Sequence, residues 1–174
     1  GADYLFSESV VIWIVLNFYI TGMRKACLTA RDVMGIFWYD RYKPLFEAII
    51  NIIVSIILGI RFGVVGIFIG TFISTMTTCF WVEPLMLYRH GLHTSVCSYF
   101  IRYGIFTFVT FYAGIVARGI CSMVGLSGIL GFCIKLAICI IVPNLIYMLS
   151  YYKSAEFRYF TALIKSSLIR SVHI

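Results

Sequence analysis

The chain has 174 residues, of which 61% are apolar and only 12% are charged, and its mean hydropathy is +0.98. Soluble globular domains carry about 25% charged residues, so the composition excludes an ordinary soluble domain and predicts an all-α polytopic membrane protein. The net charge of +7 would favour nucleic acid in a soluble chain, but here the charges flank apolar segments, and we expect membrane lipids and no nucleic acid as partners.

Five apolar segments are long enough for helices that cross a bilayer core, which takes about 20 residues each. They lie near residues 5–23 or longer, 44–60, 64–88, 99–118 and 127–150, and the family resemblance given below implies that the first covers 5–37. We therefore expect a transmembrane bundle over residues 1–152, followed by a cytoplasmic tail over 153–174. Because the first residue is Gly rather than Met, we also expect the sequence to be a piece of a longer protein. Its start shows no signal-peptide pattern.

The cationic side chains gather on one side of this predicted bundle. Two cations, Arg61 and Arg118, fall on the opposite side, and Lys135 lies within the last segment. The positive-inside rule then predicts an outside N-terminus and a cytoplasmic C-terminus. The eleven cations on the predicted cytoplasmic side are Arg24, Lys25, Arg31, Arg41, Lys43, Arg89, Arg102, Lys153, Arg158, Lys165 and Arg170.

Polar positions follow the first segment at helical spacing. Asn17, Thr21, Arg24 and Arg31 share one face if the helix continues to residue 37, and Lys25 lies beside them. Such a face would avoid lipid and line a water-filled cavity, where Arg offers bidentate donors to an anion, which the resemblance given below implies to be a pyrophosphate. The alternative is a solvated cytoplasmic loop that only orients the chain. Both interpretations satisfy the charge count.

Two further ionisable residues fall within apolar segments. Lys135 lies in the last segment, where it would either mark a substrate pathway or pair within the bundle and extend to the interface. Glu47 shares a face with Asn51 and Ser55. It is a candidate for ion coupling, although pairing with Arg41 or Lys43 is the simpler expectation.

Small residues recur in the third segment, where Gly66, Gly70 and Ser74 are four residues apart. This spacing lets helices approach closely and predicts packing within a bundle. In the tail, Phe157, Phe160, Ile164 and Leu168 alternate with cations at helical spacing, which predicts an interfacial amphipathic helix rather than a frayed end.

The chain contains no phosphate-binding loop, nucleophile elbow or zinc-protease motif. His90 and His93 lack a nearby third ligand, and the six cysteines lack metal-site spacing. We expect no enzyme activity, metal or cofactor.

The run "FWYDRYKPLFEAIINIIVSIILGIRFGVVGIFIGTFISTMTTCFWVEPLMLYRHG" resembles the C-terminal half of Wzx-type polysaccharide repeat-unit flippases, which belong to the multidrug/oligosaccharidyl-lipid/polysaccharide exporter superfamily. The aromatic turn that ends in Arg-Tyr-Lys-Pro, the helix with Glu47 and Asn51, and the "GTFIST" and "WVEP" motifs carry the likeness, which runs from about Tyr4 to Tyr112. The resemblance implies two helical lobes around a cavity, of which this chain would be most of the second and the missing N-terminal lobe its partner. It also implies alternating access that moves oligosaccharide on polyprenyl pyrophosphate across the bacterial inner membrane.

Three other functions stay open at the level of sequence. A drug exporter of the same superfamily would favour an apolar cavity with one or two acids over a cationic face. A membrane glycosyltransferase or polymerase would need an extramembrane substrate site, and the predicted outer loops are short and lack acids. A purely structural membrane subunit is the remaining alternative.

Overall fold

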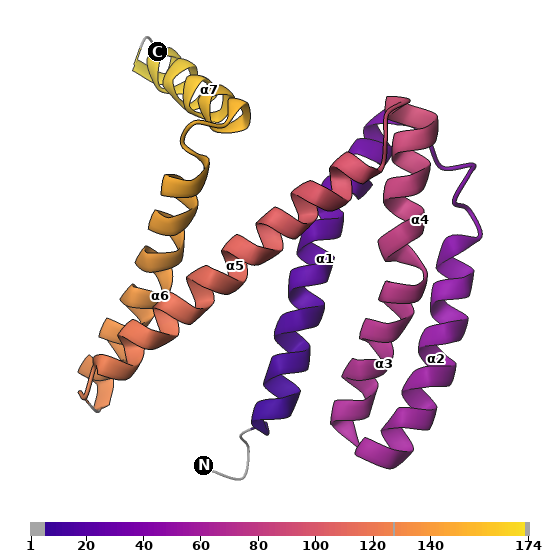
Figure 1. Ribbon diagram of the computed structural model, residues 1–174, viewed down its shortest axis with the longest axis horizontal. Helices are drawn as coiled ribbons and strands as arrows, with labels where there is room; N and C mark the ends of the chain where they lie inside the picture. Colours follow the sequence, from indigo (N-terminus) through magenta and orange to yellow (C-terminus); the bar gives the residue numbers. More distant parts are fainter. Residues whose placement is uncertain (1–5, 127, 173–174) are drawn as a thin grey trace. The chain divides into compact units, whose positions relative to one another are not determined.

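The computed structural model describes residues 6–126 and 128–172, with side chains as far as residue 164. Within these ranges every regular element is a helix, and five helical segments are long and apolar enough to cross a membrane (Figure 1). The expectation of an all-α, multi-pass membrane protein is confirmed. The five segments are α1 (Glu8–Met34), α2 (Lys43–Phe62), Val64–Leu92, α5 (Cys97–Met123) and α6 (Gly128–Tyr151).

The third membrane-spanning segment is built from three helical pieces where the sequence predicts one. They are α3 (Val64–Thr77), α4 (Cys79–Met86) and the π-helical turn η2 (Leu87–Leu92). At the first break the Thr77 and Thr78 hydroxyls both donate to the Ser74 carbonyl, at 3.1 and 2.6 Å, and such bonds bend helices. Pro84 precedes the second break and has no amide hydrogen to donate. The regular α-helix is therefore interrupted at Thr78 and ends in a π-helical turn, although the whole segment stays apolar enough to cross a membrane.

Helix α1 ends three residues before the predicted boundary because Gly35 stops it. Gly35 adopts a left-handed conformation with φ of 67°. Its N–H donates to the Asp32 carbonyl, and the Ile36 N–H donates to the Arg31 carbonyl. This pairing is a Schellman motif, which satisfies carbonyls at a helix C-terminus. The helix nevertheless includes both Arg24 and Arg31, so this stretch is a continuous helix rather than a loop.

Helices α2 and α3 form a close antiparallel hairpin, which confirms the packing predicted from the small residues of the third segment. Gly63, with φ of 60°, makes the turn between them. A Cβ atom at Gly66 would collide with the backbone of α2 at Leu58, and one at Gly70 would lie 2.7 Å from Ser55 Cα. Only residues without a side chain allow this approach.

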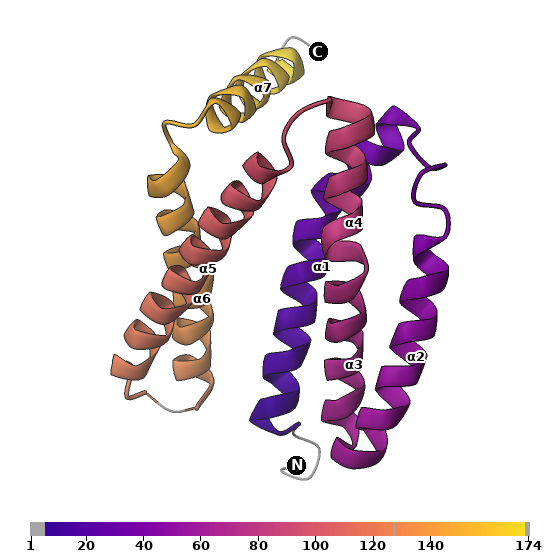
Figure 2. The same ribbon diagram turned by 45° about the vertical axis from the view of Figure 1, so that its right-hand side comes forward.

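Helix α1 packs beside α3 and α4, and both views show the four helices of this region lying side by side (Figure 2). The Trp13 and Phe72 rings meet edge to face at 5.2 Å between centroids. Near the C-terminal end of α1 there is a small buried core, formed by Cys27, Ile36 and Leu87. Most other large apolar side chains are exposed, as expected of helices that face lipid.

The chain divides at residues 101 and 102 into two compact units. The boundary therefore falls inside α5. In the second unit, the Tyr147 hydroxyl donates to Thr110 Oγ1 at 3.1 Å. A short turn after Tyr151 leads into α7 (Ala155–Val172), the helix predicted from the amphipathic tail.

Candidate functional site

The membrane-spanning helices of the first unit hold a connected group of ionised side chains, which we call the charge cluster. Three cations and four carboxylates make it up, and its net charge is therefore −1. Helices α1, α2 and α4 and the loop between α1 and α2 all contribute. The members are Arg24, Arg31, Asp32, Asp40, Lys43, Glu47 and Glu83.

Glu83 on α4 is the centre of the charge cluster. Arg24 on α1 donates two hydrogen bonds to it, from Nε to Oε2 at 3.0 Å and from Nη2 to Oε1 at 2.6 Å. Lys43 Nζ on α2 donates to the same Oε1. The Glu83 and Lys43 side chains are only 2% and 6% exposed. One carboxylate therefore joins three helices through charge-assisted bonds in a site with little solvent.

Asp40 extends the charge cluster toward the end of α1. Its carboxylate accepts a hydrogen bond from Arg31 Nη1 at 2.8 Å and lies 3.6 Å from Lys43 Nζ. Arg31 also donates to the exposed Asp32. Asp40 itself is 5% exposed. The buried loop carboxylate thus connects the two cations of neighbouring helices.

Glu47 has the loosest contacts in the charge cluster. Its Oε1 lies 3.4 Å from Arg24 Nη1 and 3.5 Å from the Thr75 hydroxyl. The sequence predicts pairing with Arg41 or Lys43, and this expectation is wrong for both. The Arg41 guanidinium instead stacks over Trp38 at 3.7 Å, and Lys43 binds Asp40 and Glu83.

The local sequence explains how these side chains meet. Arg24 and Arg31 are seven residues apart, which is two turns on one side of α1. Lys43 and Glu47 are one turn apart at the start of α2. Glu83 lies on α4, the helix that follows the break at Thr78, and it directly precedes Pro84.

Of the predicted substrate-binding residues, Arg24 and Arg31 enter the charge cluster and the others do not. Asn17 donates to the carbonyls of Phe68 and Trp13, at 3.0 and 2.8 Å, and so joins α1 to α3. Thr21 and Lys25 are exposed on α1. Arg24 and Arg31 therefore lie against carboxylates and are not free cations.

Lys135, the remaining predicted residue, belongs to the second unit. Its side chain is exposed on α6, and the Sγ atom of Cys121 lies 3.8 Å from its backbone carbonyl. Among the described residues it forms no ion pair with a carboxylate. Lys135 is therefore not part of the charge cluster that Arg24 and Arg31 enter.

Sequence reasoning missed Glu83 and Asp40 as site residues, and it considered Lys43 only as a cytoplasmic cation and a partner for Glu47. A signal for Glu83 was available, because an acid within an apolar segment needs a cationic partner. Arg24 and Lys43 were candidates for that partner. Asp40 carried no comparable signal, since it lies in a polar connection where a solvated carboxylate is ordinary.

The arrangement can exchange one anion for another. The Arg24 guanidinium holds a carboxylate through the two-pronged geometry that also suits a phosphate, and Lys43 supplies a second donor to the same atom. Comparison with protein-family models, curated proteins and solved structures finds no significant match to this chain.

Proposed function

We propose that this chain is the second lobe of a flippase that moves polyprenyl-pyrophosphate-linked oligosaccharide across the bacterial inner membrane by alternating access, for O-antigen, capsule or exopolysaccharide synthesis. The observation that carries the proposal is the buried charge cluster centred on Glu83. Ionised groups within membrane-spanning helices are costly and commonly belong to a transport pathway. The sequence resemblance supplies the substrate class.

In this proposal the carboxylates of the charge cluster hold the cationic site in its resting state. Glu83 and Glu47 neutralise Arg24 until a pyrophosphate, which carries more negative charge, replaces them. Arg24 can pass from carboxylate to phosphate without changing its donor geometry. Lys25, exposed one residue away, would make the first contact with the arriving anion.

Replacing the carboxylates also loosens the ties among α1, α2 and α4. Glu83 bridges all three helices, so its release from Arg24 and Lys43 lets them separate. A buried ion network adds little stability over apolar packing, which fits a role in a reversible change of conformation. Glu47, with its long contacts, is the carboxylate that takes up a coupled proton.

The orientation follows the positive-inside rule. The N-terminus of the chain would be outside, the C-terminus cytoplasmic, and the charge cluster toward the cytoplasmic side, where lipid-linked precursors are assembled. This orientation would let substrate enter from the inner leaflet.

The test replaces the chromosomal codons for Arg24 and Arg31 by alanine, one at a time. Surface polysaccharide is then measured beside a membrane-expression blot. A charge-assisted hydrogen bond is worth about 1.5–3 kcal/mol, so Arg24→Ala should lower affinity roughly ten- to a hundredfold. Arg24→Lys should restore only part of the activity, because the guanidinium fork is lost.

Arg61→Ala is the matched control, since Arg61 is exposed at the opposite end of α2. It removes an equal charge without touching the charge cluster. Normal polysaccharide from both Arg24→Ala and Arg31→Ala at normal expression would refute the proposal and leave these cations as orientation signals.

A second candidate is export of cationic apolar compounds, and the net negative charge of the charge cluster favours it. Under that function Glu83→Gln should sensitise cells to lipophilic cations and leave surface polysaccharide unchanged. Under the flippase proposal, Glu83→Gln should instead lower surface polysaccharide and leave sensitivity to lipophilic cations unchanged.

A further inference from the structure

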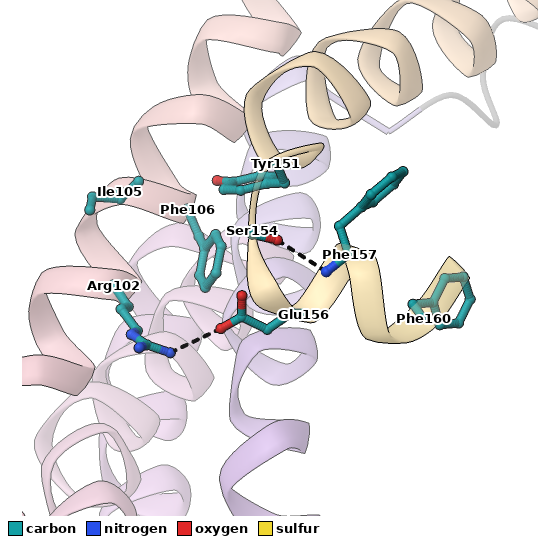
Figure 3. A pocket seen from close by; sticks show the side chains of 8 residues that line it. All are labelled: Arg102, Ile105, Phe106, Tyr151, Ser154, Glu156, Phe157 and Phe160. Atoms are coloured by element: carbon teal, nitrogen blue, oxygen red, sulfur yellow. Dashed lines mark hydrogen bonds and ion pairs between the residues drawn. The ribbon is translucent and has the colours of Figure 1, made fainter. Parts of the chain in front are cut away.

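A cavity in the second unit lies where α7 meets the ends of α5 and α6 (Figure 3). Its volume is about 430 Å³, within the range of small-molecule sites. Ile105 and Phe106 on α5 form one wall, and Phe157 and Phe160 on α7 form another. Tyr151 at the end of α6 also lines it, so the cavity is mainly apolar and is bounded by three helices.

One edge of this cavity is polar. Arg102 Nη1 lies 3.3 Å from Glu156 Oε1, and the two side chains are 68% and 70% exposed. Exposed pairs of this kind contribute little and separate readily. The other guanidinium donors of Arg102 stay available to a second anion. Ser154 Oγ accepts the Phe157 N–H at 3.1 Å and fixes the start of α7 at this edge.

The position of the cavity along the chain places it at a membrane boundary. Tyr151 lines it and is the last residue of α6, a helix of membrane-crossing length. Tyr152 follows at once, and tyrosines concentrate where the bilayer meets water. An apolar pocket with a cationic edge at this depth matches the shape of a phospholipid, whose acyl chain and phosphate are adjacent.

The surrounding charge favours an anionic headgroup. From residue 153 to residue 170 the sequence holds four cations, Lys153, Arg158, Lys165 and Arg170, against the single acid Glu156. Basic residues next to a membrane-spanning helix attract anionic lipids. A second apolar helix would fill the aromatic walls but would leave these cations without counter-charge.

We propose that this cavity binds one anionic glycerophospholipid, with its phosphate on Arg102 and an acyl chain between Phe106, Phe157 and Phe160. Binding couples α7 to the ends of α5 and α6, because the lipid contacts all three helices. Glu156 competes with the phosphate for Arg102 in the lipid-free site. The inference is independent of what the protein transports.

The test uses the full chain purified in detergent and titrated with phosphatidylglycerol or phosphatidylcholine, with retained lipid measured by mass spectrometry. The wild-type chain should retain phosphatidylglycerol preferentially. Arg102→Gln should lower that preference roughly tenfold, the effect of one charge-assisted bond. Arg118→Gln, which removes an exposed cation farther along α5, should retain it. Inorganic phosphate should not displace the lipid, since it cannot fill the apolar walls.

Glu156→Gln tests the proposed competition for Arg102 directly. Removing the competing carboxylate should raise the affinity of the chain for phosphatidylglycerol. Phe157→Ala should weaken binding of both lipids, whereas Phe108→Ala, a change at an exposed α5 residue outside the cavity, should not. Equal retention of the two lipids by the wild-type chain, or equal losses from Arg102→Gln and Arg118→Gln, would overturn the proposal. A protein chain that co-purifies in place of lipid would overturn it as well.

Discussion

Removing the charge of Glu83 should destabilise the first unit more than any other single neutralisation. Glu83→Gln keeps the shape of the side chain but leaves Arg24 and Lys43 without a counter-charge. Breaking one partner of a buried ion pair typically costs about 3–5 kcal/mol. Polar contacts in membrane proteins measure somewhat weaker because the reference state also finds partners, so we expect about 3 kcal/mol.

The measurement is thermal unfolding of the chain in detergent, followed by circular dichroism. For a chain of this size about 1 kcal/mol shifts the midpoint by roughly 2–4 °C, so Glu83→Gln should melt roughly 6–12 °C below wild type. Adding Lys43→Met should recover part of the loss, because an apolar side chain replaces the ammonium left unpaired.

Glu156→Gln is the matched control for this prediction. It makes the same chemical change in an exposed ion pair, so the midpoint should not move measurably. A Glu83→Gln midpoint within about 1 °C of wild type, with helicity preserved, would show that Glu83 does not hold the three helices together. The account of the charge cluster as their common tie would then fail.

Three further predictions concern other parts of the chain. Gly70→Leu should lower the melting midpoint by several degrees, because the new Cβ would collide with the α2 backbone. Gly104→Leu is the control and should leave the midpoint unchanged, since a Cβ there meets open space. Equal midpoints for the two variants would contradict the close contact between α2 and α3. The pKa of Glu156 is lowered by a backbone N–H bond at its own position, then by the charge of a neighbouring arginine, against an opposing effect of desolvation. The ionised Glu156 therefore stabilises the start of α7 fully above the ordinary glutamate pKa, and this stabilisation is lost as pH falls through the lowered pKa. Acid should increase proteolysis within α7. Glu156→Gln should make the proteolysis rate independent of pH in this range. A cysteine introduced at Gly63 should react with an impermeant maleimide from outside intact cells, and one at His93 should not; reaction at position 93 would reverse the proposed orientation.

The membrane-spanning helices could be predicted from the sequence because hydropathy acts over some 20 residues and averages out local exceptions. The same averaging hides where a helix bends. Residues 64–88 are apolar on average although they include several hydroxyl residues and Glu83, so averaged hydropathy indicates one segment. The break at Thr78 is local, where the Thr77 and Thr78 hydroxyls bind the Ser74 carbonyl. The end of α1 was available from Gly35, a residue favoured after a helix C-terminus.

The charge cluster could be predicted only in part, because spacing along one helix constrains which residues share a face but not what opposes that face. The 24–31 spacing places both arginines on one side of α1. Which carboxylates meet them depends on how α4 and the loop before α2 fold back, and that arrangement is not encoded in any local pattern. Glu83 is 59 residues from Arg24 in sequence, and Asp40 is nine residues from Arg31.

The ion pairs of Arg24, Arg31 and Lys43 bear on two roles that the sequence alone could not distinguish, which are orienting the chain in the membrane and offering a free cationic surface. Acidic residues contribute little to the positive-inside rule, so neutralisation of Arg24, Arg31 and Lys43 leaves the predicted orientation unchanged. It does remove them as a free cationic surface. In the proposed function, a phosphate at Arg24 takes the place of Glu83, which also holds Lys43. Binding of the substrate anion would then be coupled to the contact between α2 and α4, which is the linkage that alternating access requires.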